Sequence, residues 1–210
     1  MEGVGKTTLA VIIGEIALGK GIDVVAVDLD PQRNFTDALS FVQDRYDGLR
    51  FARGIAEADE ISRQGDVIIL DCPPALGDAT AAAIDYADIT LVPVLPDLFS
   101  LSNLGLVYEF AQRQEKAPEQ TAIVKVGFDR RALTEMAQLT LKERQYCVAG
   151  DIPVNRLIPY NLANARVWNA GIPYPSRGPY NDLFKKVLLA YERMLEGDRK
   201  STRLNSSHGS

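Results

Sequence analysis

Side chains suited to binding a phosphate group and a magnesium ion stand at the start of the chain. The segment Gly3-Val4-Gly5-Lys6-Thr7-Thr8 lies at the start of a run with helical periodicity. Glycines let successive backbone N–H groups face an anion, and a helix N-terminus adds the positive end of its dipole. Lys6 would reach the β- and γ-phosphates of a nucleotide, and the Thr7 hydroxyl would ligate Mg²⁺. This spacing predicts a phosphate-binding loop rather than an ordinary glycine-rich turn.

Carboxylates end two of the apolar runs that follow. Asp28 and Asp30 close the first run and Asp71 closes the second, and prolines follow each of them in the chain. The carboxyl ends of parallel strands meet at one edge of a sheet, so these acids should converge on the phosphate loop. There a carboxylate can hold Mg²⁺ or orient an attacking water. The alternative is that these aspartates are turn residues or helix caps. A single aspartate at a strand end would favour that interpretation, but two such strand ends in a chain with a Gly-Lys-Thr loop favour a site.

Strand and helix patterns alternate along the chain. The predicted strands are 22–29, 66–70, 89–95, 122–128 and 154–158. The predicted helices are 7–19, 101–114, 131–146 and 181–195. Most strand runs are continuously apolar, which is typical of parallel strands buried on both faces. The pattern predicts an α/β fold in a single domain, with a mostly parallel sheet flanked by helices.

The histidine and cysteine content excludes several kinds of site. The one histidine, His208, lies in the last ten residues, and the two cysteines, Cys72 and Cys147, form no C-x-x-C. A Ser–His–Asp triad, a His/Cys zinc site and an iron–sulfur cluster are therefore not expected in the body of the chain. The formal net charge of −5 argues against a uniformly basic surface, although a local basic patch remains compatible with it.

The ends of the chain suggest no membrane segment. No signal peptide is recognisable, and the apolar stretch 9–18 is too short to span a bilayer, so we expect no stable membrane insertion. Distant cysteines favour a reducing cytoplasm. Residues 201–210 show neither a helical nor a strand period. We expect them to be a non-native or disordered tail after a domain of residues 1–200.

Together these motifs resemble the ParA/MinD group of deviant-Walker P-loop ATPases. Residues 1–8 align with the K-G-G-V-G-K-T-T motif, Asp28–Gln32 with D-x-D-P-Q, and Asp71–Pro74 with D-[CT]-P-P. Ala87–Val94 resembles the A-D-x-x-L-I-P-V strand, and Arg156–Asn161 the late I-P-x-N segment. The short separation of the two acidic motifs, and the lack of a preceding helix-turn-helix domain, are most similar to the short plasmid-type ParA proteins.

The resemblance implies a P-loop NTPase fold and Mg²⁺-dependent hydrolysis of ATP to ADP and phosphate. Asp30 would help to position the attacking water, and Asp71 would support Mg²⁺. The implied catalytic residues are Lys6, Asp30 and Asp71. The implied metal site is Thr7, Asp30 and Asp71. The implied nucleotide contacts are residues 3–8 together with Pro159 and Asn161, which would lie by the adenine.

The resemblance also implies partners. It implies a homodimer that encloses ATP, a ParB-like centromere-binding adaptor that stimulates hydrolysis, and nonspecific binding to nucleoid DNA. The chain would then act in plasmid or chromosome partitioning as a cytoplasmic, nucleoid-associated protein. Basic pairs that could contact DNA are Arg130/Arg131, Lys142/Arg144 and Lys185/Lys186. For each pair, a solvated helix face is at least as good an explanation.

The first two residues depart from the family pattern. The signature lysine that reaches the partner's nucleotide falls at Met1, and the glycine after it falls at Glu2. In the family a strand precedes the loop and is central to the sheet, but no strand pattern precedes Gly3. We therefore expect an N-terminally truncated copy of an active ATPase, with the first central strand missing.

Three other functions remain open at this stage. A MinD-like membrane-associated ATPase would end in a basic amphipathic helix, whereas core packing better explains the amphipathic stretch 184–195. A catalytically impaired nucleotide-binding protein would have the altered loop as its native form. A metal-cluster scaffold would need paired cysteines, which Cys72 and Cys147 do not suggest.

Overall fold

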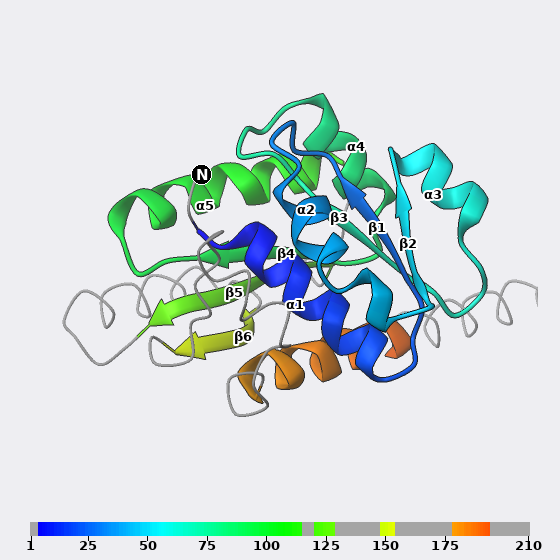
Figure 1. Cartoon of the computed structure of the whole chain (residues 1–210). Coiled ribbons are helices and arrows are strands. Elements are labelled where there is room, and N and C mark those ends of the chain that lie inside the picture. The colour runs from blue at the N-terminus through cyan, green and yellow to red at the C-terminus, as the bar shows by residue number, and fades with distance from the viewer. Residues whose placement is uncertain (1–3, 115–119, 129–147, 154–177, 194–210) are drawn as a thin grey trace, which may run out of the picture.

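The computed structural model describes residues 4–114, 120–128, 148–153 and 178–193, with helices and strands alternating along the chain (Figure 1). The helices are α1 (Lys6–Gly19), α2 (Asn34–Ser40), α3 (Ile55–Ile61), α4 (Asp78–Tyr86) and α5 (Leu98–Arg113), with a 3₁₀ turn at Gln43–Arg45. The strands are β1 (Val24–Asp28), β2 (Leu49–Ala52), β3 (Val67–Asp71), β4 (Thr90–Val94), β5 (Thr121–Phe128) and β6 (Val148–Pro153). Residues 178–193 form a further helix.

The strands form two parallel sheets of the order β2-β1-β3 and β4-β5-β6. This arrangement confirms the predicted α/β fold with parallel strands flanked by helices. The four predicted strands between residues 22 and 128 are present within two residues of their predicted ends. The helices predicted at 7–19 and 101–114 are present, and the last one, predicted to begin at 181, is already helical at residue 178, where the described residues resume. The strand predicted at 154–158 and the helix predicted at 131–146 lie outside the described residues.

Helices cover both faces of the first sheet because β1 is apolar on both sides. Val24 and Ala26 pack into the cluster formed with α1 and α2, and Val25 and Val27 pack against α3. All five β1 residues are buried. The second sheet packs against α5 through β4 and β5. None of the described helices is long and apolar enough to cross a membrane.

Helix α1 is buried on nearly all sides. The structure buries every residue from Val11 to Leu18, and not only one face of the helix. Gly14 allows this close packing, because a Cβ there would lie 3.5 Å from Ile69 on β3 and 3.9 Å from Leu39 on α2. Apart from Glu15, this buried stretch is apolar all round, and such a helix is stable only in the interior of a fold. The core therefore fixes the N-terminus of α1 relative to the end of β3.

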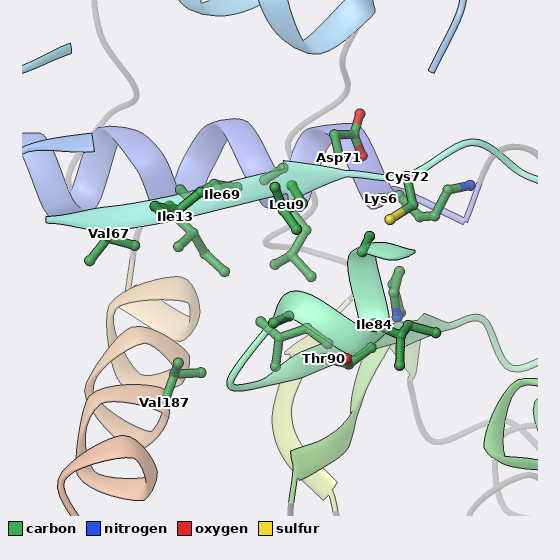
Figure 2. Close-up of a pocket in the computed structure, with 17 residues that line it drawn as sticks. Lys6, Leu9, Ile13, Val67, Ile69, Asp71, Cys72, Ile84, Thr90 and Val187 are labelled. Carbon is green, nitrogen blue, oxygen red and sulfur yellow. The ribbon is translucent and has the colours of Figure 1, made fainter. Parts of the chain in front are cut away.

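The two sheets meet at an apolar cavity. β3 ends one sheet and β4 begins the other, and both strands line a cavity of about 210 Å³ (Figure 2). Lys6, Asp71 and Cys72 lie at one end of it, and Val67 lies at the other (Figure 2).

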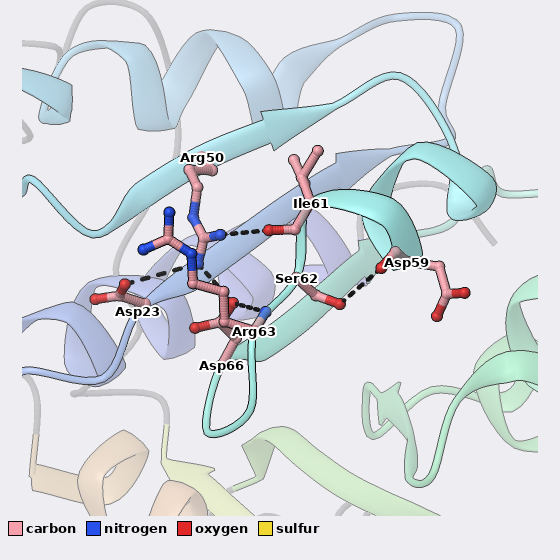
Figure 3. A network of polar contacts seen from close by, with 7 residues as sticks. All are labelled: Asp23, Arg50, Asp59, Ile61, Ser62, Arg63 and Asp66. Atoms are coloured by element: carbon pink, nitrogen blue, oxygen red, sulfur yellow. Dashed lines mark hydrogen bonds and ion pairs between the residues drawn. The ribbon is translucent and has the colours of Figure 1, made fainter.

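An ion-pair network ties together the opposite end of the first sheet (Figure 3). Arg50 on β2 donates to Asp66 Oδ2 and to the carbonyl oxygen of Ile61, and lies 3.6 Å from Asp23 Oδ2. The backbone N–H of Arg63 also donates to Asp66 Oδ2. The Asp66 side chain is only 6% exposed. A buried carboxylate without hydrogen-bond or ion-pair partners would destabilise the fold, so these contacts stabilise it.

Arg50→Ala is expected to lower the free energy of unfolding by about 3 kcal/mol, because it leaves the buried Asp66 carboxylate without its cation. Arg53→Ala is the matched control, since Arg53 is 88% exposed and pairs with Glu57 on the surface. Its loss should change the free energy of unfolding little, because exposed ion pairs contribute little to stability. Urea unfolding of both variants measures the difference, and equal losses would contradict a structural role for the Arg50 network.

Candidate functional site

The phosphate loop is shaped by a left-handed glycine at the start of α1. Gly5 has φ 89° and ψ 22°, a conformation that residues with a Cβ adopt only with strain. Its carbonyl accepts the first helical hydrogen bond, from Leu9 N–H, at 2.9 Å. In the described part of the loop no side chain caps the helix, and the first turn contains no acidic residue. The backbone N–H groups of this turn are therefore well suited to bind an anion.

A hydrogen bond joins this helix to the end of β3. Thr7 Oγ1 donates to Asp71 Oδ2 at 2.7 Å, although the two residues are 64 positions apart in the chain. Asp71 is 3% exposed. A hydroxyl oxygen and a carboxylate oxygen at this distance are the ligand types that Mg²⁺ prefers. The residues present therefore fit a magnesium ion bound beside a nucleotide phosphate.

The charge balance around Asp71 also fits a cation. The pKa of Asp71 is raised from 3.8 to about 6, mainly by burial and also by the neighbouring carboxylates of Asp28 and Asp30. The hydrogen bond from Thr7 and the charge of Lys6 act in the opposite direction on this pKa. A divalent cation next to Asp71 would favour the ionised carboxylate.

A turn held by Asp28 positions Asp30. The Asp28 carboxylate is buried and accepts hydrogen bonds from the N–H groups of Asp30, at 3.1 Å, and Thr36, at 2.9 Å. Asp30 is less buried and accepts from Gln32 N–H at 2.9 Å. Leu29 N–H donates to the Asp71 carbonyl at 2.9 Å, which holds the ends of β1 and β3 together. Asp30 thus lies at the rim, where its carboxylate can meet a water.

Sequence reasoning did not select Asp28 as a site residue. The D-x-D pattern contains both acids, but only the structure shows that their roles differ. The Asp28 carboxylate accepts hydrogen bonds from the backbone of its own loop. Such Asx-type contacts are common for Asp in turns. The signal available in the sequence was the position of Asp28 at the last residue of a fully apolar strand.

Among the described residues, no three acidic, cysteine or histidine side chains lie close enough to bind a metal by themselves. Magnesium at this site would therefore take Thr7, one or two carboxylates, phosphate oxygens and water. This is the usual composition of a magnesium–nucleotide site.

Cys72 follows Asp71 and has an unreactive thiol. Burial, and then the charge of Asp71, raise the pKa of its thiol to about 11. The thiol is protonated at neutral pH, and the thiolate is the form that attacks electrophiles and binds soft metals. This finding gives no support to a metal-cluster function.

Most of the predicted site residues that can be described lie together at this end of the fold. Val4, Gly5, Lys6, Thr7 and Thr8 form the loop and the first turn of α1. Asp30 and Asp71 lie close enough for their charges to interact, and Lys6 acts on the same carboxylate. Gly3, Pro159 and Asn161 lie outside the described residues.

Comparison with known sequences finds partition proteins. The chromosome-partitioning ATPase Soj of Treponema pallidum is 26% identical over 220 residues, covering 83% of this chain and 85% of that protein. A virulence plasmid ParA family protein of Chlamydia psittaci is 27% identical over 249 residues, covering 94% and 93%.

Comparison with solved structures shows the same fold at lower identity. The MinD cell division protein of Aquifex aeolicus superposes with a TM-score of 0.68 at 19% identity, covering 89% of this chain and 92% of that one. An ATP complex of Cyanothece McdA gives a TM-score of 0.65 at 20% identity, covering 92% and 93%. The profile of the CobQ/CobB/MinD/ParA nucleotide binding domain matches residues 1–174. The chain therefore belongs to the CobQ/CobB/MinD/ParA nucleotide-binding domain family, among the ParA/MinD-type ATPases.

Proposed function

We propose that this protein hydrolyses ATP to ADP and phosphate with Mg²⁺ and uses the ATP-bound state to segregate a plasmid or a chromosome. The observation that carries the proposal is the hydrogen bond from Thr7 to Asp71, which places a hydroxyl and a carboxylate beside the N-terminus of α1. The names of its relatives, a chromosome-partitioning ATPase and a plasmid ParA family protein, support the cellular role. An ATP complex of a protein with this fold supports the choice of nucleotide.

Each residue of the site has a distinct part in this proposal. Lys6 and the N–H groups of the first turn of α1 bind the phosphates, because both present positive charge at the same place. Thr7 and Asp71 hold the metal, which when bound offsets charge on the phosphate oxygens. Asp30 orients the attacking water from the rim of the site. Asp28 keeps the Asp30 turn in place through its two backbone hydrogen bonds.

The proposed cycle extends to partners. ATP binding would favour a homodimer, the dimer would bind DNA without sequence preference, and a ParB-like centromere-binding adaptor would stimulate hydrolysis. The protein would then act in the cytoplasm at the nucleoid. Of the three basic pairs, Lys185 and Lys186 lie on the described helix 178–193, and both are exposed. The other two pairs lie outside the described residues.

The proposal is tested by measuring ATP turnover and DNA retention of the purified chain together. With Mg²⁺ and ATP, we expect slow phosphate release and retention on a nonspecific DNA duplex. Without Mg²⁺, or with ADP in place of ATP, both should be lost. Retention should weaken steeply with salt, because the binding would depend on phosphate contacts.

Changing both Lys185 and Lys186 to alanine is expected to weaken the salt dependence of DNA binding. The slope of log K for DNA binding against log salt concentration should fall by about two in magnitude. The matched control changes Arg45 and Arg63, which are exposed but lie elsewhere on the fold, and should leave the slope unchanged. ATP binding without Mg²⁺-dependent turnover would instead favour a nucleotide-binding protein that is not an enzyme. Retention that salt does not weaken would contradict the DNA-binding part of the proposal.

A further inference from the structure

Arg33 has a backbone conformation that arginine rarely adopts. Its φ is 59° and its ψ is 22°, which places it in the left-handed region. In the part of the chain that the structure describes, it is the only residue other than glycine with a positive φ. A residue with a Cβ is strained there, whereas glycine, and sometimes asparagine, adopts the conformation readily. The backbone at position 33 therefore does not favour arginine.

The surrounding turn holds Arg33 in this conformation. Arg33 N–H donates to the Asp30 carbonyl at 3.0 Å, and the Arg33 carbonyl accepts from Asp37 N–H at 3.0 Å, in the first turn of α2. The position of α2 is fixed in turn, because Phe35 and Leu39 are fully buried in the core. Contacts on both sides of Arg33 thus impose the strain, which the folded chain retains.

The Arg33 side chain makes no contact that would offset this strain. It is exposed, and its guanidinium forms no hydrogen bond or ion pair with another described residue. Although Arg33 precedes the first residue of α2, its side chain does not cap the helix. Strained residues that the fold itself does not use are found mainly at functional sites. The observations therefore point to a function of the guanidinium.

Arg33 lies beside the candidate phosphate and metal site. Its hydrogen bond to the Asp30 carbonyl closes a tight turn, so the two residues are neighbours in space. Asp30 in turn lies close enough to Asp71 for their charges to interact. Because an arginine side chain is long and flexible, the Arg33 guanidinium can reach the place where Asp30 would orient the attacking water.

The charges of the site favour a second cation at this place. The Asp71 carboxylate lies near two further carboxylates, those of Asp28 and Asp30. Lys6 is the one described cation whose charge acts on Asp71. The phosphates of a bound nucleotide would add more negative charge, which Mg²⁺ and one lysine offset only in part. A guanidinium is always charged and can bind a phosphate group through two parallel hydrogen bonds.

We propose that Arg33 is a further catalytic residue, whose guanidinium binds the terminal phosphate of ATP from the rim of the site. This inference rests on the proposed function. In the reaction the water oxygen forms a bond to the terminal phosphorus, and the bond from that phosphorus to the ADP oxygen breaks, with its electron pair leaving on ADP. One water proton is released to solvent. Arg33 stays protonated throughout and stabilises the negative charge on the phosphate oxygens.

Arg33→Asn separates this role from folding, because asparagine lacks the cation but tolerates a left-handed backbone. We expect kcat for ATP to fall at least tenfold. The preference for ATP over ADP, measured by titration with fluorescent analogues of both nucleotides, should fall at least fivefold. The midpoint of urea unfolding should not decrease, because the strain is relieved. Arg33→Lys keeps the charge without the paired hydrogen bonds, so it should restore only part of both losses.

Arg63→Asn is the matched control, since Arg63 is exposed and lies in the network at the opposite end of the first sheet (Figure 3). It should change neither kcat nor the nucleotide preference. If Arg33→Asn behaved like Arg63→Asn, or altered DNA retention alone, the inference would be overturned and the proposed ATPase would stand. If the unchanged chain preferred ATP to ADP without hydrolysing it, the proposed function would fail, and a lower preference in Arg33→Asn would still support the phosphate contact. An unchanged chain with no preference for ATP would overturn the inference.

Discussion

Asp71→Asn is expected to remove ATP turnover and at the same time to stabilise the nucleotide-free protein. Turnover should fall by at least about a hundredfold, or about 3 kcal/mol of transition-state stabilisation, because the variant lacks the carboxylate charge that would hold Mg²⁺. Stability should rise because Asp71 is 3% exposed, and burial disfavours its ionised form. The replacement amide retains an oxygen that can accept the hydrogen bond from Thr7.

The pH dependence of this stabilisation has a definite sign. The pKa of Asp71 is 3.8 in the unfolded chain and about 6 in the folded protein. Well below pH 3.8 both states carry the proton, so the carboxyl contributes nothing to the pH dependence of stability. Between pH 4 and 6 the folded state keeps a proton that the unfolded state releases, and the free energy of unfolding falls as pH rises. Above pH 6 the ionised Asp71 carboxylate lowers the free energy of unfolding by its full amount, about 3 kcal/mol.

Urea unfolding of both proteins from pH 4 to pH 8 measures this effect. The stability difference between Asp71→Asn and the unchanged chain should be small at pH 4 and should reach its plateau by pH 7. Asp44→Asn is the control, because Asp44 is exposed and its removal should change stability little at any pH. If Asp71→Asn destabilised the nucleotide-free protein at pH 7, burial of the ionised Asp71 carboxylate would not lower the stability of the fold.

The parts of the site that depend on short-range spacing were predictable from the sequence. Gly5, Lys6 and Thr7 lie within three positions, and their relation to a helix N-terminus follows from that spacing. The contact between Thr7 and Asp71 spans 64 positions, yet a general rule predicts it. The carboxyl ends of parallel strands share one edge, and an acid at such an end must lie near the loop.

The short elements were not predictable in the same way. Five elements were not predicted from the sequence: α2, β2, α3, α4 and β6. α2 and α3 have seven residues each, too few to show a helical period, and isolated helices of this length are unstable. Their stability comes from contacts with distant residues, as where Phe35 and Leu39 enter the core beneath α1 and Ala58 packs against β1. Such long-range packing produces no local periodicity in the sequence from which these short helices could be predicted.

Lys6→Ala is expected to weaken ATP binding and turnover together, by about a thousandfold. Lys6 is the first residue of α1, directly after the left-handed Gly5, so its charge is fixed beside the N–H groups that would bind the phosphates. One charge–charge contact at 4 Å is worth about 4 kcal/mol at an effective dielectric constant near 20, which corresponds to nearly a thousandfold. Lys6 also opposes the rise in the pKa of Asp71, so its loss makes ionisation of the metal-binding carboxylate harder.

Two companion variants make the Lys6 measurement specific. Lys20→Ala removes an exposed charge just beyond the other end of α1 and should leave ATP affinity and turnover unchanged. Lys6→Arg keeps the charge but replaces a compact ammonium by a broad planar group, so it should restore only part of the affinity. Titration with a fluorescent ATP analogue and phosphate release at saturating ATP measure the two effects separately. If Lys6→Ala and Lys20→Ala behaved alike, the phosphates would not lie at the N-terminus of α1, and the arrangement of Thr7, Asp30 and Asp71 would require another substrate.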